Sequence, residues 1–229
     1  MTNPVYDLAM LSPERAPEAL VPRLISSVEP DHPDLRAREL AALKTLQLSG
    51  VTLAPTLVVP AAVEERFYRL NNLPQKLETL LQDVDPNDPD EDDVEDAAPG
   101  AVRLFKTHFL LDEFIDTFYA ALSPLPGKVR VRRSGAEGRV GVRGRPTLIA
   151  LKETWADAWR YDALLARLLA RHTVALEARP VILGAADEAA PEKVEKEIAG
   201  VLEQAGLEKP TNVWTDDGGN VTRLSFPTK

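Results

Sequence analysis

The 229-residue sequence has no cysteine and only three histidines. Without cysteine, disulfide scaffolds, thiol catalysis and thiolate metal sites are excluded, and a reducing cytoplasm is the location we expect. The three histidines, His32, His108 and His172, are far apart and lack a second ligand at metal-binding spacing, so we expect no metal site. We also expect neither a membrane span nor a signal peptide, because no apolar run approaches about 18 residues and no basic leader precedes one.

Acidic residues outnumber basic ones in this sequence. The chain has 27 Lys and Arg against 36 Asp and Glu, a formal net charge of −9. A general affinity for nucleic acid or for anionic membranes is therefore not expected, and any such contact needs a local basic patch. Because 44% of the residues are hydrophobic, we expect a folded protein rather than a disordered polyelectrolyte.

The distribution of apolar residues predicts an α+β fold with an antiparallel sheet flanked by helices. Apolar residues recur at helical spacing over five segments, and Gly or Pro marks several of their ends. These segments predict helices over 34–49, 60–69, 73–81, 112–122 and 191–205. Alternating or short apolar runs predict strands over 51–59, 128–133, 139–142 and 180–184 and a hairpin over 211–226. After Pro146, residues 147–159 fit either a helix or, through 147–152, the third strand of a meander. We divide the chain into a helical and irregular region, 1–100, and an α+β domain, 101–229.

Residues 83–96, with sequence DVDPNDPDEDDVED, hold nine acidic side chains and two prolines. This composition predicts an exposed loop that ends the N-terminal region. The glycine and closing glutamate of an EF-hand are missing, so calcium binding is not favoured. We expect Asp90, Glu91, Asp92 and Asp93 to form an acidic surface that contacts a partner protein.

Residues 128–145 are the least acidic part of the chain, with seven basic residues and one opposing carboxylate, Glu137. Valine and arginine alternate on both sides of a Gly-containing turn, which predicts a hairpin with one apolar and one cationic face. The cationic face would bind either an external anion or the acidic loop of the chain itself. The candidate anion-binding or partner-binding residues are Arg130, Arg132, Arg133, Ser134, Arg139, Arg143 and Arg145.

Ser134 beside Gly135 is the only candidate for a nucleophile on a sharp turn, and it lacks the glycine-serine-glycine elbow of hydrolases. No catalytic residues are therefore assigned, and we expect a protein that is not an enzyme.

Several stretches resemble the nucleotide-binding, ATP-grasp-like domain of phosphoenolpyruvate synthase and pyruvate phosphate dikinase. They are YDLAMLSPER at 6–15, GVTLAPTLVV at 50–59, EERFYRLNNL at 64–73, RRSGAE at 132–137 and VRGRPTLIALKETWADAW at 142–159. The resemblance implies that Arg132, Arg133 and Ser134 face a nucleotide phosphate. Where the family has Gly-Gly-Lys, this chain has RARELAA at 36–42, and little chain remains for the lobe that supplies metal-binding carboxylates. The resemblance therefore implies a reduced relative.

Three functions remain open. The first is a non-catalytic acidic adaptor or chaperone-like protein, a homodimer without a cofactor, which binds other proteins, including those associated with nucleic acids. The second is a nucleotide-binding remnant that takes ATP and magnesium. The third is weak contact of the 128–145 hairpin with single-stranded nucleic acid, which the net charge opposes.

Overall fold

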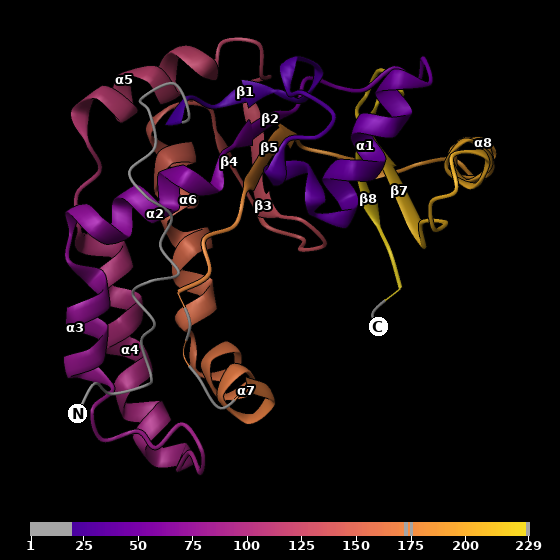
Figure 1. The fold of residues 1–229 in the computed structure, drawn as a ribbon. Coiled ribbons are helices and arrows are strands. Elements are labelled where there is room, and N and C mark those ends of the chain that lie inside the picture. Colours follow the sequence, from indigo (N-terminus) through magenta and orange to yellow (C-terminus); the bar gives the residue numbers. More distant parts are fainter. Residues whose placement is uncertain (1–19, 172–173, 175, 228–229) are drawn as a thin grey trace.

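The computed structural model describes residues 20–171, 174 and 176–227, which form helices and two antiparallel sheets (Figure 1). The expected α+β class is confirmed. The helices are α1 (Arg38–Leu48), α2 (Ala61–Leu70), α3 (Leu73–Leu80), α4 (Glu91–Thr107), α5 (Asp112–Ala121), α6 (Arg145–Ala156), α7 (Tyr161–Arg171) and α8 (Glu192–Gln204). The strands are β1 (Arg23–Leu24), β2 (Leu57–Val59), β3 (Lys128–Arg133), β4 (Arg139–Val142), β5 (Val181–Ala185), β6 (Glu188–Ala189), β7 (Asn212–Thr215) and β8 (Val221–Ser225). None of the described helices is both long enough and apolar enough to cross a bilayer.

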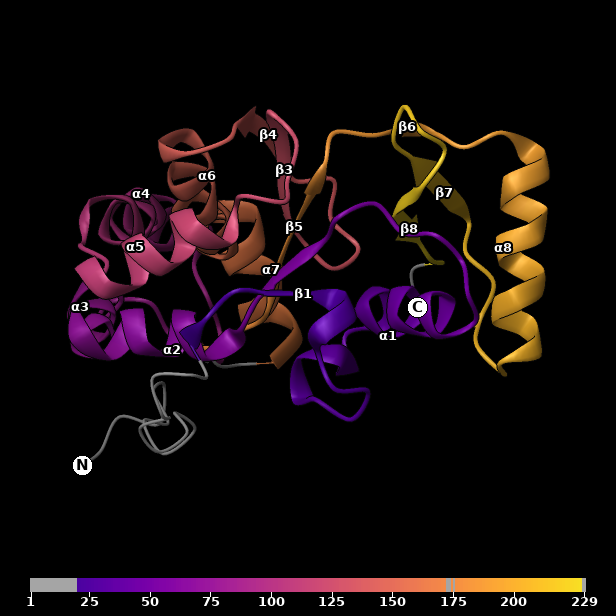
Figure 2. The ribbon, with the colours of Figure 1, turned by 90° about the horizontal axis from the view of Figure 1, so that it is seen from above.

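The larger sheet has the order β1-β2-β5-β3-β4, and the smaller sheet has the order β6-β7-β8. Seen from above, the larger sheet lies between two layers (Figure 2). Helices α2 to α7 cover one face, and α1, the smaller sheet and α8 lie on the other side. The central strand β5 is buried along its whole length, as expected for a short continuous apolar run.

Two hydrophobic cores lie on opposite faces of the larger sheet. In β3, Val129 and Val131 point into the core shared with the helical layer. In β2 and β5, Val58 and Ile182 point into the other core, which α1, α8 and the smaller sheet complete. Because side chains alternate between the faces of a strand, Arg130 and Arg132 of β3 face this second layer.

Residues 145–156 form helix α6 and not a third strand, so the 128–142 segment is a hairpin without a meander. The chain turns at Gly144, whose φ of 114° favours glycine, and Pro146 lies in the first turn of the helix. Thr147, Leu151 and Trp155, spaced four residues apart, are buried on one side of α6.

The acidic segment 83–96 is not wholly a loop, because its second half forms the first turns of α4. Asp90 is the N-cap and its carboxylate accepts a hydrogen bond from the backbone N–H of Asp92 at 2.9 Å. Carboxylates are favourable in the first turn of a helix, and Val94 is buried in the core. The predicted boundary at residue 100 falls inside α4, and the larger sheet joins strands from both sides of it.

Candidate functional site

The arginines of the β3–β4 hairpin are bound by carboxylates from other parts of the chain. Arg132 is 3% exposed and forms an ion pair with Glu39 of α1, which is 1% exposed. Its second terminal nitrogen donates to the Thr222 carbonyl at 3.2 Å. Arg132 therefore connects the larger sheet to α1 and to β8.

The carboxylate of Glu39 accepts hydrogen bonds from several directions. Besides Arg132, the backbone N–H of Gly135 donates to Oε2 at 3.1 Å and that of Leu224 donates to Oε1 at 3.0 Å. Ser134 Oγ accepts from the backbone N–H of Glu39 at 3.3 Å. Where the family resemblance places a ligand phosphate beside Arg132 and Ser134, the chain places its own carboxylate.

Arg130 faces the same layer, and its Nη2 lies 3.0 Å from Asp187 Oδ1. Arg223 of β8 shares this carboxylate, with Nε 3.4 Å from Oδ2, and its guanidinium stacks over the Trp214 ring, 3.7 Å from the centroid. Burial lowers the pKa of Arg223 and the neighbouring arginines lower it further, whereas Asp187 raises it. Together with the Arg132–Glu39 pair, the cluster holds three arginines against two carboxylates.

Arg133 lies on the opposite face and pairs with Glu64 of α2. Its two terminal nitrogens donate to the two carboxylate oxygens at 2.7 and 3.0 Å, while Tyr68 donates its hydroxyl to the same carboxylate. Burial opposes the charge of Arg133, but attraction to Glu64 outweighs it and raises the pKa of Arg133. Burial and the Glu64 charge also raise the pKa of Tyr68 well above its ordinary value.

The remaining predicted anion-binding residues lie toward β4 and α6. Arg139 pairs with Asp157, with 2.6 Å between Nη2 and Oδ1, and this hydrogen bond raises the pKa of the arginine. Arg143 donates to the Leu125 carbonyl at 2.6 Å, and Arg145 is exposed at the start of α6. The predicted residues thus surround the hairpin on both faces of the sheet and do not converge on one open anion site.

Asp90, Glu91, Asp92 and Asp93 lie at the exposed N-terminal end of α4, at the bottom of Figure 1, and the hairpin lies in the upper part. The carboxylates that pair with the hairpin arginines come from α1, α2, α6, residue 157 and residue 187 rather than from this acidic segment.

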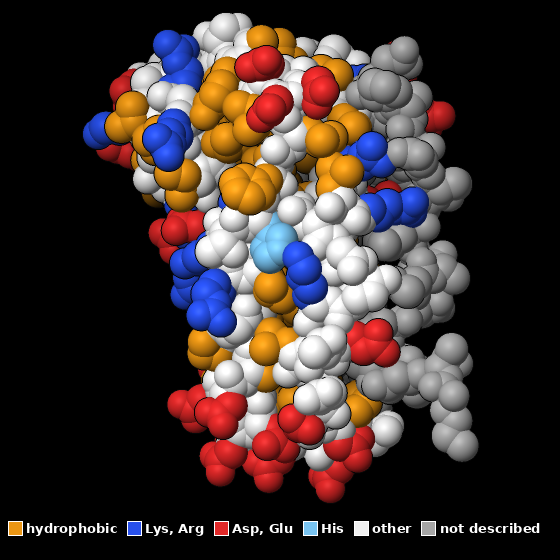
Figure 3. Space-filling model, turned by 90° about the vertical axis from the view of Figure 1, so that its left-hand side faces the viewer, with side chains coloured by type: hydrophobic (Ala, Val, Ile, Leu, Met, Phe, Trp, Pro, Cys, Tyr) orange, Lys and Arg blue, Asp and Glu red, His pale blue; other side chains and the backbone are white. Residues whose placement is uncertain are grey.

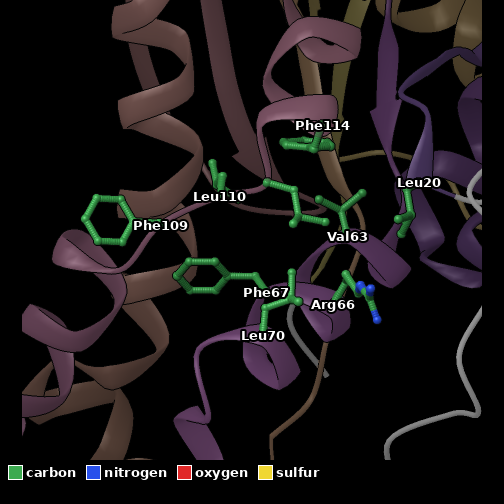
Figure 4. Close-up of a pocket in the computed structure, with 9 residues that line it drawn as sticks. Leu20, Val63, Arg66, Phe67, Leu70, Phe109, Leu110 and Phe114 are labelled. Carbon is green, nitrogen blue, oxygen red and sulfur yellow. The ribbon is translucent and has the colours of Figure 1, made fainter.

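Phe109 is a large aromatic residue at the surface of the protein. Its side chain is 84% exposed, whereas Phe105 and Phe114 on either side of it in the chain are buried. It lies beside a shallow apolar groove between α2 and the start of α5 (Figure 4). The other residues that line the groove include Leu20, Val63, Phe67, Leu70, Leu110 and Phe114.

The backbone around Phe109 is held by side chains from neighbouring helices. Asn71, which follows α2, donates to the Phe109 carbonyl at 2.9 Å, and Lys152 of α6 donates to the His108 carbonyl at 2.6 Å and the Lys106 carbonyl at 2.7 Å. Figure 4 shows the Phe109 ring at one edge of the groove, pointing away from the other lining side chains. The chain therefore fixes the position of this residue and leaves its ring in solvent.

This exposed surface, formed by Leu70, residues 108–111 and the start of α5, is called the Phe109 face below. In Figure 3 a band of hydrophobic side chains crosses the upper half of the view, with acidic side chains over its upper part and basic ones beside and below it. The sequence signal that could have identified it is local. Phe109 lies just before Asp112, where the sequence predicts the start of a helix, and in the structure it follows the end of α4, so it belongs to the connection between two helices.

Within the described residues no group of three or more His, Asp or Glu side chains is arranged to hold a metal ion. His32 caps a short 3-10 turn and His108 contacts Lys76, with 2.6 Å between Nε2 and Nζ. His172 and the 6–15 stretch lie outside the described residues.

No protein-family model matches this chain, and a comparison with curated proteins finds no match either. The resemblance to the phosphoenolpyruvate synthase domain therefore stays a prediction from the sequence.

Proposed function

We propose that this chain is a non-catalytic protein-binding protein whose binding surface is the Phe109 face. The observation that carries the proposal is the 84% exposure of a phenylalanine whose backbone is fixed by Asn71 and Lys152. Exposing a large aromatic ring gives a single chain no stability, whereas an aromatic side chain on a backbone that is already fixed binds a partner without the added entropy cost of ordering the backbone. Residues that dominate protein interfaces are commonly aromatic anchors of this kind.

The shape of the surface favours a protein over a small molecule. Small-molecule sites are concave and bury most of the ligand, whereas Phe109 projects from the edge of a shallow groove. The groove is lined mainly by aliphatic and aromatic side chains, which suit the apolar side chains of another protein.

The experiment is affinity capture from a cell extract with the wild-type chain and two variants. Phe109→Asp places a charge where the proposed contact needs an apolar ring. Leu169→Asp, at a leucine of α7 that is 60% exposed, makes the same chemical change elsewhere. We expect proteins that are retained by the wild type and by Leu169→Asp but lost with Phe109→Asp. Equal capture by all three would overturn the proposal.

Nucleotide binding is a second candidate, which two observations favour. Residues 145–156 form a helix, as the resemblance to the phosphoenolpyruvate synthase domain implies. The cluster of Arg130, Arg132 and Arg223 also has one more positive charge than its two carboxylates neutralise, which an anion would balance. Against it, Glu39 already occupies the donors around Arg132.

The nucleotide candidate is tested by thermal unfolding with ATP and magnesium. A ligand at a hundred times its dissociation constant adds about 2.7 kcal/mol of stability, which corresponds to a rise of several degrees in Tm. The rise in Tm should disappear in the Arg130→Gln variant, because Arg130 is the most exposed of the three arginines and the one that a ligand can reach most easily. An unchanged Tm would eliminate this candidate and leave protein binding.

A further inference from the structure

Basic side chains precede Phe109 in the chain and acidic side chains follow it at similar separations. Arg103 and Lys106 precede it by six and three residues, and Asp112 and Asp116 follow it by three and seven. All four side chains are exposed, the first pair at the end of α4 and the second at the start of α5, and Lys106 also lies 3.9 Å from Glu153 of α6. The charges also suit the dipoles of their own helices, but those dipoles do not account for the exposed ring between them.

We infer that the Phe109 face binds a second copy of this chain, as a two-fold symmetric homodimer. In such a dimer the same patch contacts itself, so the patch must be its own complement. A two-fold axis between the Phe109 ring and the groove, with the end of α4 on one side and the start of α5 on the other, would pair Asp112 with Lys106 of the other copy and Asp116 with Arg103. This inference rests on the proposed function and names its partner.

The apolar part of the face has the same complementarity. Phe109 projects at one edge of the groove, and Val63, Leu70 and Phe114 line it (Figure 4). In a two-fold arrangement each ring packs across the mouth of the shallow groove of the other copy, so that both exposed rings and both grooves are covered. Leu70, which is 45% exposed, would become covered in the same contact.

Charge pairing accounts for the choice of partner. Each chain carries a net charge of −9, so two copies repel each other unless opposite charges meet locally. A partner that presented only acidic or only basic side chains would repel half of this face. A second copy presents both signs in the required order, which favours specific pairing.

The first measurement is the mass of the full chain by light scattering and sedimentation over a wide concentration range. We expect a dimer for the wild type and for Leu169→Asp, and dissociation of Phe109→Asp, with Kd raised at least about 30-fold, as for an interface hot spot. A wild type that is monomeric throughout, or a dimer that Phe109→Asp leaves unchanged, would overturn the inference.

Charge reversal tests the orientation of the two copies. Arg103→Glu with Lys106→Glu makes both sides acidic, and Asp112→Lys with Asp116→Lys makes both sides basic. Each double variant alone should be monomeric, whereas an equimolar mixture should form a one-to-one heterodimer because every contact then joins opposite charges. Circular dichroism of each variant confirms that it is folded. Failure of the two folded variants to pair overturns the two-fold arrangement.

The same data separate this inference from the proposed function. A monomeric wild type that still captures another protein through Phe109 overturns the homodimer and leaves the protein-binding function intact. A monomer that captures nothing through Phe109 overturns both. A monomer in which Phe109→Asp lowers Tm much more than Leu169→Asp does would mean that residues of the same chain cover the ring, which also overturns the homodimer.

Discussion

Glu39, in the first turn of α1, and Arg132, in β3, form a buried ion pair between positions 93 residues apart in the chain. The pair joins α1 to the larger sheet, which separates the two hydrophobic cores. The backbone N–H groups of Gly135 and Leu224 donate two further hydrogen bonds to the carboxylate. Neither charge can be removed alone without leaving the other buried and unpaired.

Glu39→Ala should therefore lower the free energy of unfolding by about 3–5 kcal/mol, because Arg132 remains buried without its carboxylate. Urea unfolding followed by the fluorescence of the buried Trp155 and Trp159 measures the change. Glu208, which pairs with Arg38 on the surface, is the matched control, and Glu208→Ala should cost about 1 kcal/mol or less. Equal losses would contradict the central role of the buried pair.

The raised pKa of Tyr68 predicts that the folded chain loses stability at alkaline pH. Its pKa is raised in the folded chain, so the stability that it contributes is complete below about pH 10, its unfolded pKa, and is lost as the pH rises toward the folded value. Above about pH 10 the free energy of unfolding should fall more steeply for the wild type than for Tyr68→Phe. Urea unfolding at a series of pH values checks this, and parallel profiles would show that Tyr68 ionises as readily in the folded chain as in the unfolded one.

Gly138 closes the β3–β4 turn with a φ of 75°, and a Cβ there would lie 2.3 Å from the Val131 carbonyl oxygen. Gly138→Ala should therefore destabilise the chain by about 2 kcal/mol or more, since both the backbone and the contact are strained. Gly135 has a similar φ of 78° but open space around it, so Gly135→Ala should cost about 1 kcal/mol. Thermal unfolding of the two variants compares them, and a larger loss at Gly135 would reverse the expected order.

Asp90 caps helix α4, so we expect its substitution to change the stability of the chain independently of any partner. Asp90→Ala should cost about 1 kcal/mol, because the N–H of Asp92 loses its acceptor, whereas Asp90→Asn should cost little. The double variant Glu91→Gln with Asp93→Asn tests binding of the acidic surface to a basic partner, because it removes two charges and keeps helix α4. Deletion of the acidic residues is a poorer test, since it would also remove Val94 from the core. Partner capture that is unchanged in the neutralised variant would exclude this acidic surface.

The elements that follow clear apolar periods were predictable from the sequence. The helix 192–204, the hairpin 212–225 and the strands of the 128–142 hairpin lie close to their expected positions, because their residue patterns and turn glycines specify them locally. Residues 145–156 were ambiguous, since a short apolar run fits a helix or a strand until its packing partners are known. Acidic residues 91–96 have the composition of a loop, but the Asp90 cap and the burial of Val94 make them the start of helix α4.

The sequence by itself determined the α+β class, the alternation of valine and arginine in the 128–142 hairpin and the absence of thiol chemistry. Only the tertiary structure decided what the arginines contact, because Glu39, Glu64 and Asp187 approach them from distant parts of the chain. It also decided that Phe105 is buried while Phe109 is exposed. An apolar period predicts which residues share a face, but the burial of each one depends on which elements pack over it.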